Sequence, residues 1–270
     1  MAADGGACFI CLDTSPPPIH GNSGLAHIAC LVQAAASQQA QRGNDVWRQC
    51  QTCKQGYTGA MQTGLAEAWR MRLAGQAAEN TERLEAESNL VVSLLYQGKV
   101  VEAEPMFRRV HEVRMGVLGA EHPDTLTCAS NLATSLSHQR KHAEAERINR
   151  EVLGVRKRVL GAEHPDTLMS ANNLSMSLAD QGKYAEAERI QREVLGAQKR
   201  VLGAEHPDTL KSAGELAASL SIQGNNADAE RIQREVLGAM QRVLGAEHPD
   251  TLTSANDLAT FLSEDRKSVV

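Results

Sequence analysis

Leucine, alanine, isoleucine and valine recur every three or four positions from about residue 60 onwards, and this spacing predicts amphipathic helices. One apolar stripe consists of Leu126, Ala129, Leu132, Ala133 and Leu136, and a later one of Ile148, Val152, Val155 and Val159. Because a helix turns once in about 3.6 residues, each stripe lies on one side of its helix. We predict that the stripes form the buried core.

The pattern returns at a fixed period. The sequence Leu-Gly-Ala-Glu-His-Pro-Asp-Thr-Leu occurs four times with a spacing of 42 residues, ending at Leu126, Leu168, Leu210 and Leu252. Such a period is typical of a solenoid, in which each repeat buries its apolar face only against its neighbours. We therefore predict an all-α solenoid. Surfaces of this kind bind other molecules more often than they catalyse reactions.

Each repeat is predicted to contain two antiparallel helices. The first begins at the His-Pro-Asp sequence, since proline costs no hydrogen bond in the first turn and aspartate favours the positive end of the helix dipole. The second begins after a turn such as Gln181-Gly182-Lys183. We interpret the recurring histidines as loop and cap residues rather than a ladder of metal ligands; they are His122, His164, His206 and His248.

A glutamate precedes an arginine by four residues in the second helix of three copies. The pairs are Glu146–Arg150, Glu188–Arg192 and Glu230–Arg234. This arrangement is typical of a solvated helix face with weak ion pairs.

The repeat unit reads Asn-Leu-x-x-x-Leu-x-x-Gln-Gly-Lys-x-x-Glu-Ala-Glu, followed by Val-Leu-Gly-x-x-His-Pro-Asp-Thr. It resembles the tetratricopeptide repeats of kinesin light chains over about residues 79–263. The resemblance implies a right-handed superhelix whose first helices line a concave groove for extended peptides. A role as a cargo adaptor for a motor is an alternative, although no long heptad coiled coil precedes the repeats.

One position of the first helix changes from amide to acid along the repeats: Asn89, Asn131, Asn173, Glu215 and Asp257. In the related repeats an asparagine here faces the groove. An amide both donates to and accepts from the backbone of a peptide, whereas a carboxylate only accepts. We expect the acidic positions to favour donors or basic side chains. The alternative, plain solvent-exposed polar residues, remains open.

The chain has 270 residues, a formal net charge of −5 and 3% aromatic residues. The acidic balance argues against nucleic acid as a partner. No apolar run of 18 residues or basic, apolar leader is present, so we expect a soluble, cytoplasmic protein that does not bind membranes.

Five of the six cysteines precede residue 54. Cys8–Cys11, His27–Cys30 and Cys50–Cys53 are pairs with zinc spacing in a loop-rich stretch with little apolar core of its own. In a reducing compartment such clusters are typical of metal sites. We therefore predict a zinc-binding module at residues 1–58, a linker helix at 59–77 and the solenoid at 78–270. Cys128, in the repeats, is predicted to be a small buried side chain.

The order of these pairs, with Trp47 before the last of them, resembles a RING-CH (RING-variant) zinc finger over residues 7–58. The resemblance implies a first zinc held by Cys8, Cys11, His27 and Cys30, and half of a second site at Cys50 and Cys53. The cysteine pair that the family has between Cys11 and His27 is missing. His20 is the one remaining common zinc ligand that could complete the second site, and an oxygen of Asp13 could be its fourth donor. A four-thiolate site of Cys8, Cys11, Cys50 and Cys53 is a further possibility.

RING-type modules act as ubiquitin ligases by docking a ubiquitin-conjugating enzyme, for which the resemblance implies a contact at Ile10. The missing pair, and a last knuckle without the proline common in active ligases, count against this activity. No catalytic residues are identified. Our leading interpretation is a binding scaffold with a peptide groove and a degenerate zinc finger, with a ligase that recruits substrates through its repeats as the alternative.

The linker itself carries an apolar stripe of Met61, Leu65, Trp69 and Leu73. This stripe predicts an amphipathic helix that packs the N-terminal module onto the first repeat.

Overall fold

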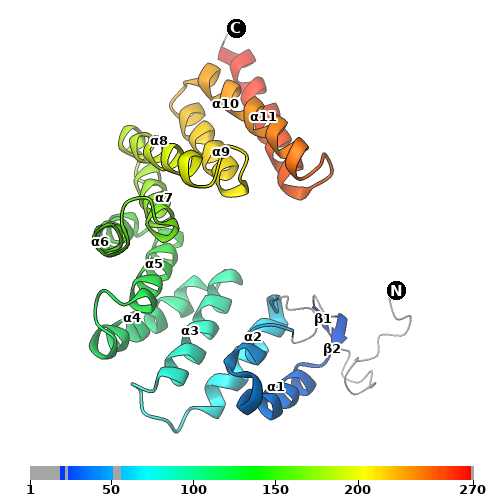
Figure 1. Cartoon of the computed structure of the whole chain (residues 1–270), viewed down its shortest axis with the longest axis vertical. Coiled ribbons are helices and arrows are strands. Elements are labelled where there is room, and N and C mark those ends of the chain that lie inside the picture. The colour runs from blue at the N-terminus through cyan, green and yellow to red at the C-terminus, as the bar shows by residue number, and fades with distance from the viewer. Residues whose placement is uncertain (1–18, 22–23, 51–55, 269–270) are drawn as a thin grey trace. The chain divides into compact units, whose positions relative to one another are not determined.

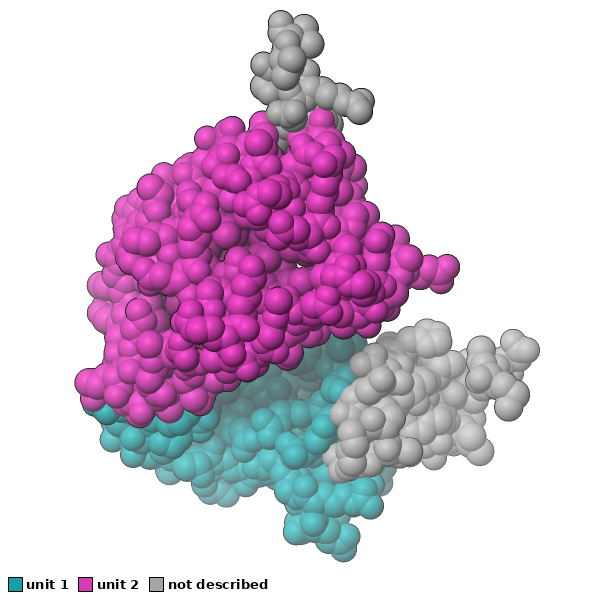
Figure 2. Space-filling model, turned by 45° about the horizontal axis from the view of Figure 1, so that its top comes forward, with its two compact units in different colours: residues 1–139 teal, residues 140–270 magenta. Residues whose placement is uncertain are grey.

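The computed structural model describes residues 19–21, 24–50 and 56–268, and the side chains of residues 27–50 and 56–262. This part of the chain contains eleven α-helices, one short 3-10 helix and a two-stranded sheet (Figure 1). The chain divides into two compact units, residues 1–139 and 140–270, coloured separately in Figure 2. Each unit is considered by itself.

Unit 1 begins with a small hairpin and a helix. Strands β1 (Ile19–Gly21) and β2 (Gly24–Ala26) pair antiparallel, and they are followed by α1 (Ile28–Arg42) and the 3-10 helix η1 (Asn44–Trp47). The prediction of a loop-rich stretch was wrong for residues 28–42, which form a helix. Helix α1 buries Leu31 and Ala35 in an apolar cluster that it shares with Met61 and Trp69 of the next α-helix.

The centre of this cluster is a pair of stacked tryptophans. The rings of Trp47 and Trp69 lie 6.0 Å apart with their planes 1° from parallel, and both are buried. Trp69 belongs to α2 (Gly59–Arg72), the helix that the linker stripe predicts, and α2 contacts both α1 and α3 (Thr81–Tyr96). Ala86 of α3 joins the same cluster. The segment before the repeats and the first repeat helix therefore share one core.

The remaining helices follow one another as packed neighbours. Unit 1 continues with α4 (Val100–Val117) and α5 (Pro123–His138). Unit 2 consists of α6 (His142–Leu160), α7 (Pro165–Ala179), α8 (Tyr184–Val201), α9 (Pro207–Ile222), α10 (Asn226–Val243) and α11 (Pro249–Ser268). Within each unit every helix from α3 on packs against the next one (Figure 1). The predicted helix pairs are confirmed.

The predicted helix starts are also confirmed. Each repeat histidine is the N-cap residue of its helix, and its Nδ1 accepts a hydrogen bond of 3.2 Å from the backbone N–H of the aspartate two residues later. Proline occupies the first helical position. Between α7 and α8, Gly182 adopts a φ of 75°, and the N–H of Lys183 then reaches the carbonyl of Leu178 at 2.9 Å.

The first predicted apolar stripe is confirmed and the second only in part. All five residues of the first stripe, which begins at Leu126 and ends at Leu136, are buried. In α6 Ile148 and Val152 are buried, but Val159 is 49% exposed. Arg156, which the stripe did not include, is only 2% exposed. The second stripe is thus partly wrong, because a polar residue occupies the covered side of the helix.

Candidate functional site

The groove positions predicted from the sequence line clefts in both units. In unit 1, Asn89 of α3 and Asn131 of α5 line a cleft of about 510 Å³. Arg114 of α4 and Leu118, the residue after that helix, also line it. We call it the α3–α5 cleft. Two residues that are 42 positions apart in the sequence thus face one space, as expected for equivalent positions on neighbouring first helices.

Unit 2 contains the corresponding cleft. Asn173 of α7 and Glu215 of α9 line a space of about 360 Å³, and Gln198, Val201 and Leu202 at the end of α8 close it. We call it the α7–α9 cleft. Asp257, the last of the five positions, is exposed on α11. Four of the five residues predicted for the groove thus lie in two equivalent clefts of the structure.

Three polar side chains in these clefts have no partner within the described part of the protein. Among the described residues, the side chains of Asn131, Asn173 and Glu215 form no hydrogen bond or ion pair, although all three are half-buried. Burial raises the pKa of the Glu215 carboxyl above its ordinary value, and the charge of Lys211 opposes this shift. Asn89 differs, since its Nδ2 is buried without a partner.

A second set of polar residues is buried between helices, and no hydrophobic period could have revealed it. Arg156 of α6 donates from Nη1 to the carbonyl of Asp166 at 3.1 Å and to Ser170 Oγ at 2.9 Å. Asn149, also of α6, donates to Ser177 Oγ at 2.9 Å. The sequence did contain one indication of these buried residues. A polar residue recurs every 42 positions, as at Asn149, Gln191 and Gln233, on a side of the helix that is otherwise apolar.

The glutamate–arginine pairs form, but their face is not simply solvated. Arg150, Arg192 and Arg234 each pair with the glutamate four residues earlier. Glu146, however, is buried, and it also accepts hydrogen bonds from Lys183 at 2.7 Å and from Gln181 at 2.6 Å. The prediction of a plain solvated face was therefore wrong for Glu146, which ties α6 to the turn before α8.

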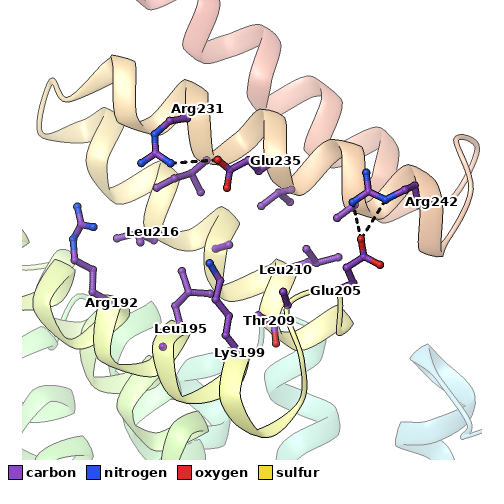
Figure 3. A pocket seen from close by; sticks show the side chains of 16 residues that line it. Arg192, Leu195, Lys199, Glu205, Thr209, Leu210, Leu216, Arg231, Glu235 and Arg242 are labelled. Carbon is purple, nitrogen blue, oxygen red and sulfur yellow. Dashed lines mark hydrogen bonds and ion pairs between the residues drawn. The ribbon is translucent and has the colours of Figure 1, made fainter.

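Another cleft lies between the second helices α8 and α10 (Figure 3). Its volume is about 460 Å³, and its floor is apolar, with Leu195, Leu210 and Leu216 among its residues. Four of the charges around it form two exposed ion pairs, Arg242 with Glu205 at 2.6 Å and Arg231 with Glu235 at 3.3 Å, while Lys199 and Arg192 also line it. We place the candidate site in the clefts of the first helices because the predicted groove positions lie there.

Part of the cysteine module falls outside the described residues. Cys8, Ile10, Cys11 and Cys53 lie there, and so does Asp13. His20 belongs to strand β1, and its side chain is likewise outside the described part.

The described ligand candidates are His27, Cys30 and Cys50. His27 and Cys50 are buried, and Cys30 is partly buried, with its Sγ 3.8 Å from Nδ1 of His27. No cluster of three or more candidate metal ligands occurs among the residues whose positions the structure describes.

None of the described helices is both long enough and apolar enough to cross a membrane.

The repeating helix pairs define an α-solenoid, and the sequence comparison identifies its family. The tetratricopeptide repeat model matches residues 85–124, 125–166, 167–208 and 209–250. These matches cover more than half of the chain, which therefore belongs to the tetratricopeptide repeat family. A search of curated proteins found no match to this sequence.

Solved structures show the same fold at low sequence identity. A putative kinesin light chain with nearly identical TPR-like repeats from Podosopora anserina is 22% identical, and the alignment covers 80% of this chain and 95% of that one, with a TM-score of 0.59. BtubC (BKLC) from P. vanneervenii is 18% identical over 75% of this chain and 82% of that one, with a TM-score of 0.63. The apo form of RapI is 12% identical over 89% and 83%, with a TM-score of 0.51.

Proposed function

We propose that this protein is an interaction scaffold that holds extended segments of partner proteins in the clefts between the first helices of its repeats. The observation that carries the proposal is the pairing of equivalent positions: Asn89 with Asn131 in the α3–α5 cleft, and Asn173 with Glu215 in the α7–α9 cleft.

The chemistry of these clefts suits a peptide backbone. An extended peptide presents N–H and C=O groups on alternating sides, and a carboxamide can satisfy one of each. Because Asn131 and Asn173 are half-buried and make no side-chain hydrogen bond among the described residues, they are partly desolvated before a ligand arrives. The cost of ordering and desolvating these amides is then lower than for a fully hydrated side chain.

The test is selection of peptides by the full chain. A displayed library of random heptapeptides is selected on immobilised protein, and the retained sequences are measured against the single variants Asn131→Ala and Asn173→Ala. We expect each variant to weaken the peptides that use its cleft by about fivefold, the worth of one hydrogen bond.

The matched control removes an amide elsewhere. Gln241 is exposed on α10 and lines neither cleft, so Gln241→Ala should leave every selected peptide bound. If wild type retains no peptide, or if the peptides bind the two asparagine variants as well as wild type, the groove function is wrong.

We also propose that the N-terminal module binds zinc. Zinc bonds of about 2.0–2.1 Å to nitrogen and 2.3 Å to sulfur at the tetrahedral angle place the two ligand atoms roughly 3.6 Å apart. The Nδ1–Sγ distance of 3.8 Å between His27 and Cys30 supports a shared metal ion. Bound zinc would add folding free energy to the N-terminal segment.

Elemental analysis of purified full-length protein tests this proposal. One zinc per chain that is lost on His27→Ala would support the first site, and two zincs would support the second site with His20. Protein that folds with no zinc would refute both. The ubiquitin-ligase and motor-adaptor hypotheses stay predictions from the sequence.

A further inference from the structure

Helix α7 presents two exposed methionines to the α7–α9 cleft. Met169 is 51% exposed and Met176 is 54% exposed, and both line the cleft together with Val201. They are seven residues apart, about two helical turns, so they lie on the same side of α7 with Asn173 between them. Large apolar side chains at this exposure contribute little to the core, which is a reason to ask what they contact.

The other repeats show that the solenoid does not require methionine at these positions. The equivalents of Met169 and Met176 are Thr127 and Thr134 in α5, Lys211 and Ala218 in α9, and Thr253 and Thr260 in α11. All three of those helices form with polar or small residues there. The methionine pair therefore distinguishes the α7–α9 cleft from its equivalents.

Acidic side chains from both helices also line the same cleft. Glu215 of α9 is half-buried, and among the described residues it has no ion-pair partner within 4.0 Å, although Lys211 lies one turn earlier. Asp166 and Asp208 also line the cleft, so three carboxylates face one lysine. The two aspartates sit in the first turns of α7 and α9, where the helix dipole offsets their charge. Glu215 lies beyond the first turn of α9, and the charge of Lys211 compensates it only in part.

We propose that the α7–α9 cleft selects a peptide segment in which a lysine or arginine stands near a large aliphatic residue. The cation meets Glu215, and the aliphatic side chain packs on Met169 and Met176. This inference rests on the proposed function, because it names the kind of segment that one of the two clefts holds.

Each half of the recognition has a physical basis. Methionine is flexible and polarisable, so two of them form an apolar surface that adapts to side chains of different shape. A partly desolvated carboxylate gains more from a cation than a fully hydrated one does, since less water must be displaced when they meet. An acidic segment would instead place like charges together in a narrow space.

The experiment repeats the heptapeptide selection with variants of the α7–α9 cleft. In each variant, a cleft residue is replaced by the residue that occupies the equivalent position in another repeat. Glu215→Asn installs the residue found at positions 131 and 173. The double change Met169→Thr and Met176→Thr installs the residues of α5. Because these residues occur in folded helices of the same chain, both variants should fold, which circular dichroism checks.

We expect wild type to enrich peptides that carry lysine or arginine together with leucine, isoleucine or methionine. Glu215→Asn should reduce the enrichment of basic residues about fivefold while leaving the aliphatic preference, and the double methionine variant should do the reverse. Glu235→Gln removes a carboxylate beside the α8–α10 cleft and should change neither preference.

The outcomes separate this inference from the proposed function. Peptides that bind without enrichment of basic residues, or whose basic preference survives Glu215→Asn, would overturn the inference and leave the scaffold intact. A library from which wild type retains nothing would remove the proposed function and the inference with it.

Discussion

Arg156 of α6 donates from Nη1 to the hydroxyl of Ser170 in α7, over 2.9 Å, and the same nitrogen reaches the carbonyl of Asp166 at 3.1 Å. Arg156 as a whole residue is 2% exposed. Burial lowers the pKa of Arg156 from its ordinary value, and the charge of Asp166 acts in the opposite direction. A positive charge inside the solenoid is thus held by the first turn of the next helix.

Replacing Arg156 with alanine should destabilise the protein by about 2–3 kcal/mol, because it removes two charge-assisted hydrogen bonds and opens space between α6 and α7. Arg156→Gln should cost less, since Gln198 occupies the equivalent buried position one repeat later. Urea unfolding measures both values. Arg189→Ala, at an exposed site, is the control. Equal losses for Arg156→Ala and Arg189→Ala would contradict the interpretation.

Glu146 predicts a dependence of stability on pH. Burial alone would raise its pKa, but hydrogen bonds from Lys183 and Gln181 and the charge of Arg150 outweigh burial and hold the pKa below its ordinary value. A lowered folded-state pKa stabilises the fold above the unfolded-state pKa, near 4.3, and this contribution disappears as the pH falls through the folded-state value.

We therefore expect Glu146→Gln to be less stable than wild type at pH 7, with the difference shrinking as the pH falls below about 4. The measurement is the free energy of unfolding at several pH values. Glu193→Gln, at an exposed ion pair of α8, should show little difference at any pH. A constant difference for Glu146→Gln across the range would disprove the charge-based explanation.

The histidine caps predict a pattern of substitutions. His164→Ala leaves the N–H of Asp166 without its Nδ1 acceptor and should cost about 1 kcal/mol. His164→Asn should retain most of the stability, since asparagine is a strong cap. Hydrogen exchange at the Asp166 amide gives a local readout, and it should quicken in the alanine variant only. Equal exchange in wild type and His164→Ala would show that the cap is unimportant.

Cys128 is predicted to be chemically inert in the folded protein. Its thiol is 2% exposed, and burial raises its pKa to about 11, an effect that the charge of Arg114 partly offsets. At pH 8 only about one thiol in a thousand would be ionised. Alkylation followed by mass spectrometry of the Cys128 peptide should therefore show labelling in denaturant and almost none in the native state.

A companion variant tests the packing interpretation of the same residue. Cys128→Ser should change the free energy of unfolding by less than about 1 kcal/mol, because serine occupies the equivalent positions 170, 212 and 254. Rapid native-state labelling of Cys128 together with a large loss in Cys128→Ser would argue for a different environment around the thiol.

Local chemistry explains why much of the fold could be predicted. The His-Pro-Asp starts and the glycine of the Gln-Gly-Lys turn act within a few residues, so Pro165 and Gly182 mark a boundary whatever the helix packs against. The 42-residue period then predicts which positions are equivalent, and the pairing of Asn173 with Glu215 in one cleft follows from it.

The errors have a common cause, since periodicity assigns residues to a side of a helix but does not say what covers that side. Val159 has the right spacing for the core but is half exposed, whereas Arg156 is covered and donates to two acceptors in α7. Glu146 is buried for the same kind of reason, through contacts from Lys183. The stacking of Trp47 on Trp69 depends on a contact between η1 and α2 that no local pattern encodes.

The sequence by itself therefore determined the repeat, its helix boundaries and the equivalent positions along the clefts, because these depend on caps, turns and period. Only the tertiary structure decided which polar residues are buried and that Met169, Met176 and Glu215 line one space. Those properties arise from contacts between helices, and the free energy of a charged or apolar side chain depends on the neighbours that replace its water.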